Sequence, residues 1–275
     1  MDRRRQFVPW KAAGETSDEQ STADEVVRRT GWVFNNRRGA ELDLASFVET
    51  GDHETGKFVQ VFGLEHLADD AHSLVEIGSG IGRMTASFSR MFGSVTACDL
   101  DAAFLERCRQ TVARFGRAER LHTVHVFDGR TVRVPSDSAD LVFSYITLQH
   151  CHPDDALELT REAVRIAKPG GSVALNYRMW SPPDAFIWPT GRVVRGVWQL
   201  PVVGPRLARQ RSLTRLGWQA SRLGPSQVLA EVGADLAEVR LFRSPKRRPF
   251  GLPGAHEQTF EGVHPSHWWL VASVR

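Results

Sequence analysis

Leu74-Val-Glu-Ile-Gly-Ser-Gly-Ile-Gly-Arg83 is the stretch that decides the fold. Its start is a short, largely apolar run that predicts a buried strand, and a helical pattern of apolar residues follows it. The glycines between them, Gly78, Gly80 and Gly82, let the backbone turn sharply and approach a ligand without a Cβ in the way. The helix that follows offers free N–H groups at its first turn. The stretch therefore predicts a strand, a ligand-binding turn and a helix.

The same alternation continues from Ser73 to Arg178. Short apolar runs separated by helical patterns are typical of βαβ units, and thus of a parallel sheet with helices on both faces. The expected strands are 74–77, 94–99, 123–128, 141–146 and 172–177, with later ones at about 236–242 and 267–274.

Helical spacing and capping residues predict the helices. Asp101 and Asp154 are each expected to cap a helix, because a side-chain oxygen can accept from the free N–H groups of the first turn. Apolar residues between Glu41 and Leu67 predict two short helices, with a break at 49–51, and another helix is expected over 226–232.

One domain is expected over residues 41–275. A chain of 275 residues with 41% apolar content can bury one large core, and residues 1–40 read as a flexible start followed by a docking segment. Residues 179–225 are rich in Pro, Trp and Arg and break the alternation, which predicts an inserted cap.

The numbers of charged residues and cysteines restrict the expected binding partners and cellular compartment. With 35 basic and 32 acidic residues, the net charge of +3 is too small to indicate strong nucleic-acid binding. The three cysteines lack metal-type spacing, so we expect no disulfide, no metal site and a cytoplasmic protein. The sequence shows no secretory signal and no apolar run long enough to span a membrane.

An acidic residue supports a nucleoside ligand at the glycine turn. Asp99 ends the second expected strand, 21 residues after Gly78, where a carboxylate can accept from both ribose hydroxyls. The glycines are spaced G-x-G-x-G and not G-x-G-x-x-G, which implies a ligand less phosphate-like than a dinucleotide. No G-x-x-x-x-G-K-[ST] sequence is present, so a nucleoside triphosphate is disfavoured.

Five motifs follow one another within residues 73–178: VEIGSGIG, ACDLD, FDG, ADLVFSYITLQH and AKPGG. In this order they resemble the core of class I S-adenosylmethionine-dependent methyltransferases. The resemblance implies an α/β, Rossmann-like mixed sheet of seven strands in the order 3-2-1-4-5-7-6. Strand 7 would be antiparallel, with helices on both faces. It also implies S-adenosyl-L-methionine as the cofactor and S-adenosyl-L-homocysteine as the product.

The resemblance also implies a set of cofactor contacts. The glycine turn would pass under the cofactor, Glu76 would orient its methionine end and Asp99 would hold its ribose. Adenine would pack on Leu100, near Asp128. The residues expected to bind the cofactor are Glu76, Gly78, Ser79, Gly80, Arg83, Asp99, Leu100, Asp128, Gly129 and Ser144. Asp128 could instead cap a turn, and Ser144 could satisfy backbone groups.

His150 is the candidate general base, because it follows the fourth strand where that strand opens into the expected site, and imidazole titrates in the useful range. The alternative is structural, with the imidazole fixing the loop by hydrogen bonding to backbone. Tyr145 is a further pocket candidate with the same ambiguity.

The leading functional hypothesis is in-line methyl transfer to a small molecule, with oxygen as the favoured nucleophile. Tryptophans and arginines of the cap would suit an anionic, aromatic, glycosylated or lipid acceptor, although they could simply pack on the sheet. Nucleic-acid base methylation is disfavoured, because SYIT lacks the two prolines of the usual [DNS]-P-P-[YF] motif. The alternatives are an RNA methyltransferase that uses the arginine-rich cap and a cofactor-binding protein without turnover. The oligomeric state stays open.

Overall fold

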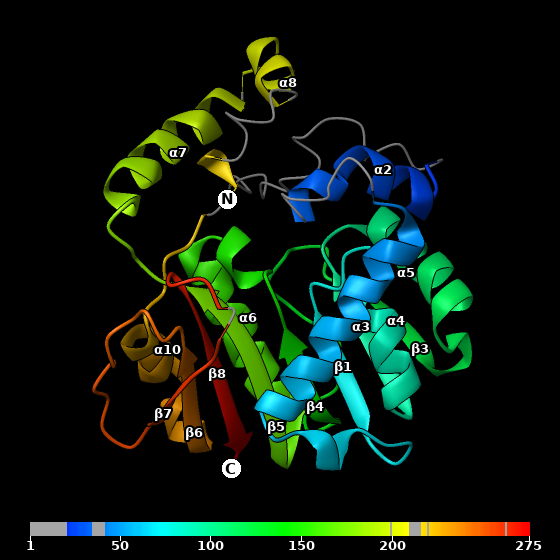
Figure 1. Cartoon of the computed structure of the whole chain (residues 1–275), viewed down its shortest axis with the longest axis vertical. Helices are drawn as coiled ribbons and strands as arrows, with labels where there is room; N and C mark the ends of the chain where they lie inside the picture. Colours follow the sequence, from blue (N-terminus) through cyan, green and yellow to red (C-terminus); the bar gives the residue numbers. More distant parts are fainter. Residues whose placement is uncertain (1–20, 35–41, 199, 209–215, 219, 262) are drawn as a thin grey trace.

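The computed structural model describes residues 21–34, 42–198, 200–208, 216–218, 220–261 and 263–275. Of the expected flexible start and docking segment, residues 1–40, only residues 21–34 are described, and the rest lies outside the described residues. The described part of the chain builds one twisted sheet with helices on both faces (Figure 1).

Eight strands form the sheet, in the order β3-β2-β1-β4-β5-β8-β6-β7. The first five in this order are mutually parallel, whereas β8 runs antiparallel to β5 and to β6. The expected fold class is confirmed, with β8 and β6 in the places of strands 7 and 6. The strands are β1 Ser73–Ile77, β2 Ser94–Asp99, β3 Leu121–His125, β4 Ala139–Ser144, β5 Ala167–Arg178, β6 Leu236–Arg243, β7 His256–Thr259 and β8 His267–Val274.

The expected count of seven strands is wrong by one edge strand. β7 pairs in parallel with β6 and consists of His-Glu-Gln-Thr, with no buried residue. A strand with no buried side chain has no apolar alternation, so the pattern that predicts strands could not reveal it.

Two strand ends also differ from expectation. β3 ends at His125 and not at 128, because the Gly129 N–H donates to the Val126 carbonyl and closes a turn there. β4 ends at Ser144 and not at 146, and Ile146 has a φ of 52°, which a strand does not allow. Both corrections lengthen the loops at the carboxyl edge of the sheet.

Helices cover both faces of the sheet. On one face α3 and α4 pack through Phe58, Phe62 and Phe88 on a cluster that includes Trp269. On the other face α6 and α10 pack on a cluster that includes Trp268. The helices are α2 Ala23–Phe34, α3 Leu44–Val61, α4 Arg83–Met91, α5 Ala102–Phe115, α6 Pro153–Ile166, α7 Asp184–Trp198, α8 Val203–Ala208 and α10 Pro225–Val232.

The expected break at 49–51 is wrong, because α3 runs through it as one helix of 18 residues. Gly51 has a packing role there: a Cβ at this position would lie 2.3 Å from the Arg83 carbonyl oxygen. The glycine lets α3 lie against the start of α4, which follows the glycine turn.

The N-cap residue predicted for one helix is confirmed, and the one predicted for another helix is wrong. Asp101 caps α5, since its carboxylate accepts from the Ala103 N–H at 2.9 Å. Asp154 does not cap α6, because that helix begins at Pro153 with His152 as the N-cap residue. Proline is suited to the first helical position, and Asp154 lies within the first turn.

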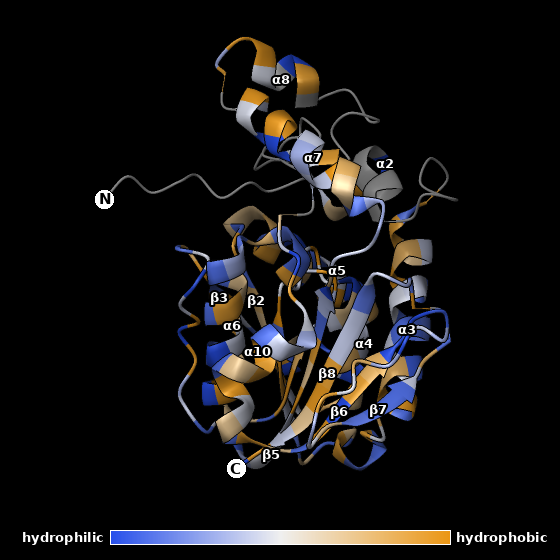
Figure 2. Cartoon of the chain, turned by 90° about the vertical axis from the view of Figure 1, so that its left-hand side faces the viewer, coloured by the Kyte–Doolittle hydropathy of each residue, from blue (hydrophilic) through white to orange (hydrophobic). Residues whose placement is uncertain are grey.

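The cap follows β5 and lies over the carboxyl edge of the parallel strands (Figure 1). Two of its helices are described, α7 and α8, and Figure 2 shows that both contain apolar residues, of which Phe186, Val193 and Val203 are exposed. No described helix has the length and apolar character needed to cross a membrane.

Candidate functional site

The glycine turn between β1 and α4 presents bare backbone at the carboxyl edge of the sheet. Gly78, Gly80 and Gly82 have φ angles of 85°, 56° and 90°, which only glycine adopts without strain. A Cβ on Gly78 would lie 2.1 Å from the Oγ1 atom of Thr147, whereas a Cβ on Gly80 would meet no atom within 4 Å. The backbone at Gly80 therefore faces open space.

Asp99 lies beside this open backbone at the end of β2. Its Oδ2 atom accepts from the Gly80 N–H at 2.8 Å, and its Oδ1 atom accepts from the Asp101 N–H at 2.9 Å. Burial raises the pKa of Asp99 to about 6, although both N–H groups oppose the shift. A buried carboxylate that still has free acceptor capacity suits a ligand with hydroxyl groups.

Glu76 places a second buried carboxylate in β1, and it is only 4% exposed. The Thr85 hydroxyl donates to its Oε2 atom at 2.6 Å, and burial raises the pKa of Glu76 to about 7. Among the described residues, no lysine, arginine or histidine forms an ion pair with Glu76 or with Asp99. Two unpaired buried acids beside open backbone fit a nucleoside ligand that also carries a cationic group.

Arg83 was expected to bind the cofactor, and in the structure it contacts α3. Its Nη1 atom lies 2.5 Å from a carboxylate oxygen of Glu54 and 3.3 Å from the Thr50 hydroxyl, and its guanidinium lies over the Phe47 ring. These contacts connect α4 to α3 beside the site. A cofactor contact for Arg83 stays a prediction.

Asp128 and Ser144 both make the structural contacts that were their alternatives. The Oδ1 atom of Asp128 accepts from the N–H groups of Arg130 and Thr131 at 2.9 Å, and these two bonds hold its pKa below the usual value against the effect of partial burial. The Ser144 hydroxyl donates to the Ile77 carbonyl at 2.9 Å. Their roles in cofactor binding stay predictions.

The remaining expected cofactor residues also lie at the carboxyl edge of the sheet. The Ser79 N–H donates to the Cys98 carbonyl at 3.1 Å, which holds the turn against the end of β2. The Leu100 carbonyl accepts from the His125 Nε2–H at 2.9 Å. Gly129 has a φ of 68° in the turn after β3. All expected cofactor residues thus surround one edge, as the parallel topology requires.

His150 attaches the cap to the core. Its Nδ1 atom lies 2.6 Å from the Trp218 carbonyl oxygen, which can only accept, so Nδ1 carries the proton. The N–H groups of Ala220 and Ser221 donate to the Gln149 carbonyl next to it, at 2.9 and 3.1 Å. Burial lowers the pKa of His150 to about 4, so the imidazole is neutral at physiological pH.

The buried, neutral state of His150 predicts a specific dependence of stability on pH. An unfolded histidine takes up a proton near pH 6.5, whereas folded His150 does so only near its lowered pKa of about 4. The stability that this difference contributes is present above pH 6.5 and is lost as the pH falls toward 4. His150→Gln should remove this contribution, so the difference in free energy of unfolding between parent and variant should narrow by about 1–2 kcal/mol from pH 7.5 to pH 5. Chemical unfolding at each pH measures this difference. The same pH dependence of the free energy of unfolding in both proteins would contradict the prediction.

A pocket of about 330 Å³ lies where α3 meets the loops after β4 and β7 and the strands β5 and β8. Tyr145, a pocket candidate from the sequence, lines it and stacks on Trp269, with ring centroids 5.2 Å apart. The other lining residues are His53, Glu54, Lys57, Phe58, Ile146, Asn176, Phe260, Val263, His264, His267 and Trp269.

Sequence reasoning missed the polar lining of this pocket. His53, Glu54 and Lys57 come from α3, while His264 and His267 lie at the other end of the chain. One signal was available for the last pair: β8 was expected, and in an antiparallel pairing its first residue, His267, comes opposite the end of β5. The α3 residues had no motif that marked them.

Residues 75–175 match the family model described as a methyltransferase domain. The matched segment is thus a methyltransferase domain, as the resemblance to class I S-adenosylmethionine-dependent methyltransferases implied. The expected family, an enzyme family whose cofactor is S-adenosyl-L-methionine, is confirmed for this core of the chain.

Curated relatives resemble the core of this chain. A carboxy-S-adenosyl-L-methionine synthase from Pseudomonas putida is 32% identical over 117 residues, which cover 41% of this chain and 47% of the relative. The chain thus spans about half the length of the curated relatives it matches.

Solved structures share the fold at low identity. A proposed sarcosine dimethylglycine methyltransferase from Galdieria sulphuraria has a TM-score of 0.52 at 15% identity, over 70% of this chain and 64% of that one. A chain in the complex of the Trm112 methyltransferase activator with a methyltransferase from Haloferax volcanii has a TM-score of 0.52 at 13% identity, over 88% of this chain and 96% of that one.

Proposed function

We propose that this chain transfers the methyl group of S-adenosyl-L-methionine to an oxygen atom of a small molecule. The observation that carries the proposal is the open backbone at Gly80, bonded to the buried carboxylate of Asp99, with a second buried carboxylate, Glu76, in the strand that leads into the turn. Asp99 would hold the ribose, and Glu76 would hold the methionine end. When bound, the cofactor supplies a methyl group already activated on a sulfonium.

The chain's own residues then have to position the acceptor. The pocket beside α3 offers a space for it, with Tyr145 and Trp269 as an aromatic wall. Alignment of this kind can lower a barrier by roughly 7 to 11 kcal/mol, so it can supply much of the rate without other chemistry.

Of the two roles that the sequence left open for His150, we propose the structural one. Its Nδ1–H is committed to the Trp218 carbonyl, and a pKa of about 4 makes the imidazole a weak base. His150 would thus hold the loop after β4 in place and keep the cap over the pocket.

The contacts of the cap arginines favour a small acceptor over RNA. Arg195 donates to the Gly217 carbonyl at 3.1 Å, Arg222 pairs with Asp184, and the Arg192 guanidinium lies over the Trp188 ring. These side chains make contacts within the cap, whereas an RNA-binding surface would present them to phosphates. Residues 209–215, which hold three further arginines, lie outside the described residues.

The test is incubation of the full chain with methyl-labelled S-adenosyl-L-methionine and a panel of hydroxylated metabolites. We expect S-adenosyl-L-homocysteine and label in one acceptor, and less of both with an Asp99→Ala variant at the same subsaturating cofactor concentration. Three outcomes would overturn the proposal. Label in RNA with steep salt dependence would support the RNA alternative. A carboxylated cofactor would indicate the reaction named in the curated relatives. Cofactor binding without product across the panel would indicate a binding protein.

A further inference from the structure

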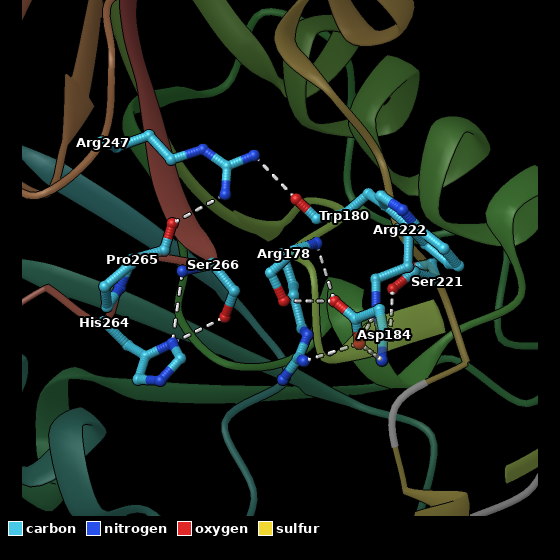
Figure 3. Close-up of polar contacts among 10 residues, drawn as sticks. Arg178, Trp180, Asp184, Ser221, Arg222, Arg247, His264, Pro265 and Ser266 are labelled. Carbon is cyan, nitrogen blue, oxygen red and sulfur yellow. Dashed lines mark hydrogen bonds and ion pairs between the residues drawn. The ribbon is translucent and has the colours of Figure 1, made fainter. Parts of the chain in front are cut away.

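A buried charged cluster lies where the cap leaves β5 (Figure 3). Asp184, at the start of α7, is fully buried. Its carboxylate pairs with Arg178 at 2.9 Å and with Arg222 at 2.8 Å, and the Ser181 N–H donates to it at 2.9 Å. The cluster thus joins the end of β5, the first helix of the cap and the segment by which the cap returns.

In the described part of the chain, two guanidinium groups of this cluster share one carboxylate. The side chains of Arg178 and Arg222 are only 10% and 5% exposed, and both pair with Asp184. Burial and the charge of Arg222 disfavour the protonated form of Arg178, whereas Asp184 favours it. A buried guanidinium that shares its acid with a second one suits an anionic ligand.

Arg178 also has hydrogen-bonding capacity left over. Its Nη2–H donates to Asp184, whereas its buried Nε–H has no acceptor in the described part of the chain. By contrast, Arg222 directs both its Nε–H and its Nη2–H at the same Asp184 oxygen, at 3.0 and 2.8 Å. Arg178 is therefore the member of the pair with donors to offer a ligand.

The sheet places Arg178 next to the pocket. Side chains two residues apart on a strand share a face, so Arg178 follows Asn176 on the face of β5 that lines the pocket. In the register with β8, Arg178 is opposite His267, another lining residue. Burial, and after it the charge of Arg178, lowers the pKa of both His264 and His267.

The neighbouring imidazole of His264 contacts Ser266 through one ring nitrogen. Its Nδ1 atom lies 2.7 Å from the Ser266 hydroxyl oxygen and accepts from the Ser266 N–H at 3.2 Å, an arrangement that leaves Nε2 to carry the proton of the neutral ring. The one carboxylate among the lining residues, Glu54, is paired with Arg83. The end of the pocket near β5 and β8 thus presents donors and positive charge.

We propose that the methyl acceptor carries a carboxylate, which binds at this end of the pocket with Arg178 as its main partner. A guanidinium matches the planar, two-oxygen geometry of a carboxylate, and His264 can add a third donor. Arg178 is then a specificity-determining residue of the acceptor site. The inference rests on the proposed function, since it describes the acceptor of that reaction.

The experiment is calorimetric titration of the full chain, saturated with S-adenosyl-L-homocysteine, with benzoate, 4-hydroxybenzoate and acetate and with the matching neutral amides. At least one carboxylate should bind tenfold or more tightly than its amide, and equally so at pH 6.5 and 8.5, because a guanidinium stays charged over this range. Arg178→Met should abolish the preference. Arg192→Met, which removes an exposed charge from the neighbouring cap, should keep the preference for carboxylates.

A purely structural role for Arg178 gives a different result. Arg178→Met would then lower the melting temperature and leave the ratio of carboxylate to amide affinity unchanged, which overturns the inference. Should Arg178→Met not fold, Arg178→Lys retains the charge without the planar fork and should reduce the preference at an unchanged affinity for S-adenosyl-L-homocysteine.

Two further outcomes also count against the inference. Absence of a preference for every carboxylate overturns it, and so does a tenfold preference for phenyl phosphate over benzoate. If S-adenosyl-L-homocysteine itself does not bind, the proposed function fails, and that failure is visible before any carboxylate is added.

Discussion

Gly80→Ala should weaken the affinity for S-adenosyl-L-homocysteine by at least tenfold while the fold remains intact. A Cβ at this position meets no protein atom within 4 Å, so it would project into the space that we assign to the cofactor. The φ of 56° adds a backbone strain of about 1–2 kcal/mol, which a domain of this size tolerates. Calorimetry gives the affinity, and thermal unfolding gives the cost in stability.

Gly170→Ala is the matched control for this prediction. Gly170 has a φ of 80°, and a Cβ there also meets nothing within 4 Å, but it lies near the start of β5, at the opposite edge of the sheet. The two variants should lose similar stability, and only Gly80→Ala should lose affinity. Equal affinities in both variants would place the cofactor away from the glycine turn.

Asp99→Ala should weaken cofactor binding by about ten- to one-hundred-fold. A charge-assisted pair of hydrogen bonds to the ribose is worth about 1.5–3 kcal/mol, and each 1.4 kcal/mol corresponds to a factor of about ten in affinity. The variant also leaves the N–H groups of Gly80 and Asp101 without their carboxylate acceptor, which loosens the glycine turn. Both effects act in the same direction.

Asp101→Ala separates the ribose contact from general damage at this corner. The variant removes the N-cap of α5 and should cost about 1 kcal/mol of stability. Its affinity for S-adenosyl-L-homocysteine should stay close to that of the parent. An unchanged calorimetric affinity of Asp99→Ala would contradict the assigned role of Asp99.

The sequence predicted those parts of the fold that depend on local pattern. The strands β1 and β2, the glycine turn and the capped start of α5 each carry an apolar period or a turn residue that stands in the sequence itself. β7 carries no such period, because its side chains lie at a solvated sheet edge. Gly51 misled the prediction of α3, because its role is close contact with Arg83 of another helix.

The candidate site also has one part that local sequence pattern predicted and one part that it did not. The proposed cofactor site comes from consecutive strands, so position in a motif was enough to indicate Glu76 and Asp99. The pocket proposed for the acceptor is assembled by α3, β5 and β8, which are distant in sequence. The cluster of Arg178, Asp184 and Arg222 also forms only in three dimensions, since pairing over 38 residues leaves no local pattern.

In the described part of the chain, the cap is tied to the core at both of its ends and at the loop after β4. It leaves at Arg178 and returns at Leu223, whose N–H donates to the Arg178 carbonyl at 2.9 Å, and it also binds the backbone of Gln149. We expect such a layout to allow exchange of the region: a different cap joined between these two residues should leave the proposed cofactor site in place and change the acceptor. Diversification of acceptors in such enzymes then requires no redesign of the sheet.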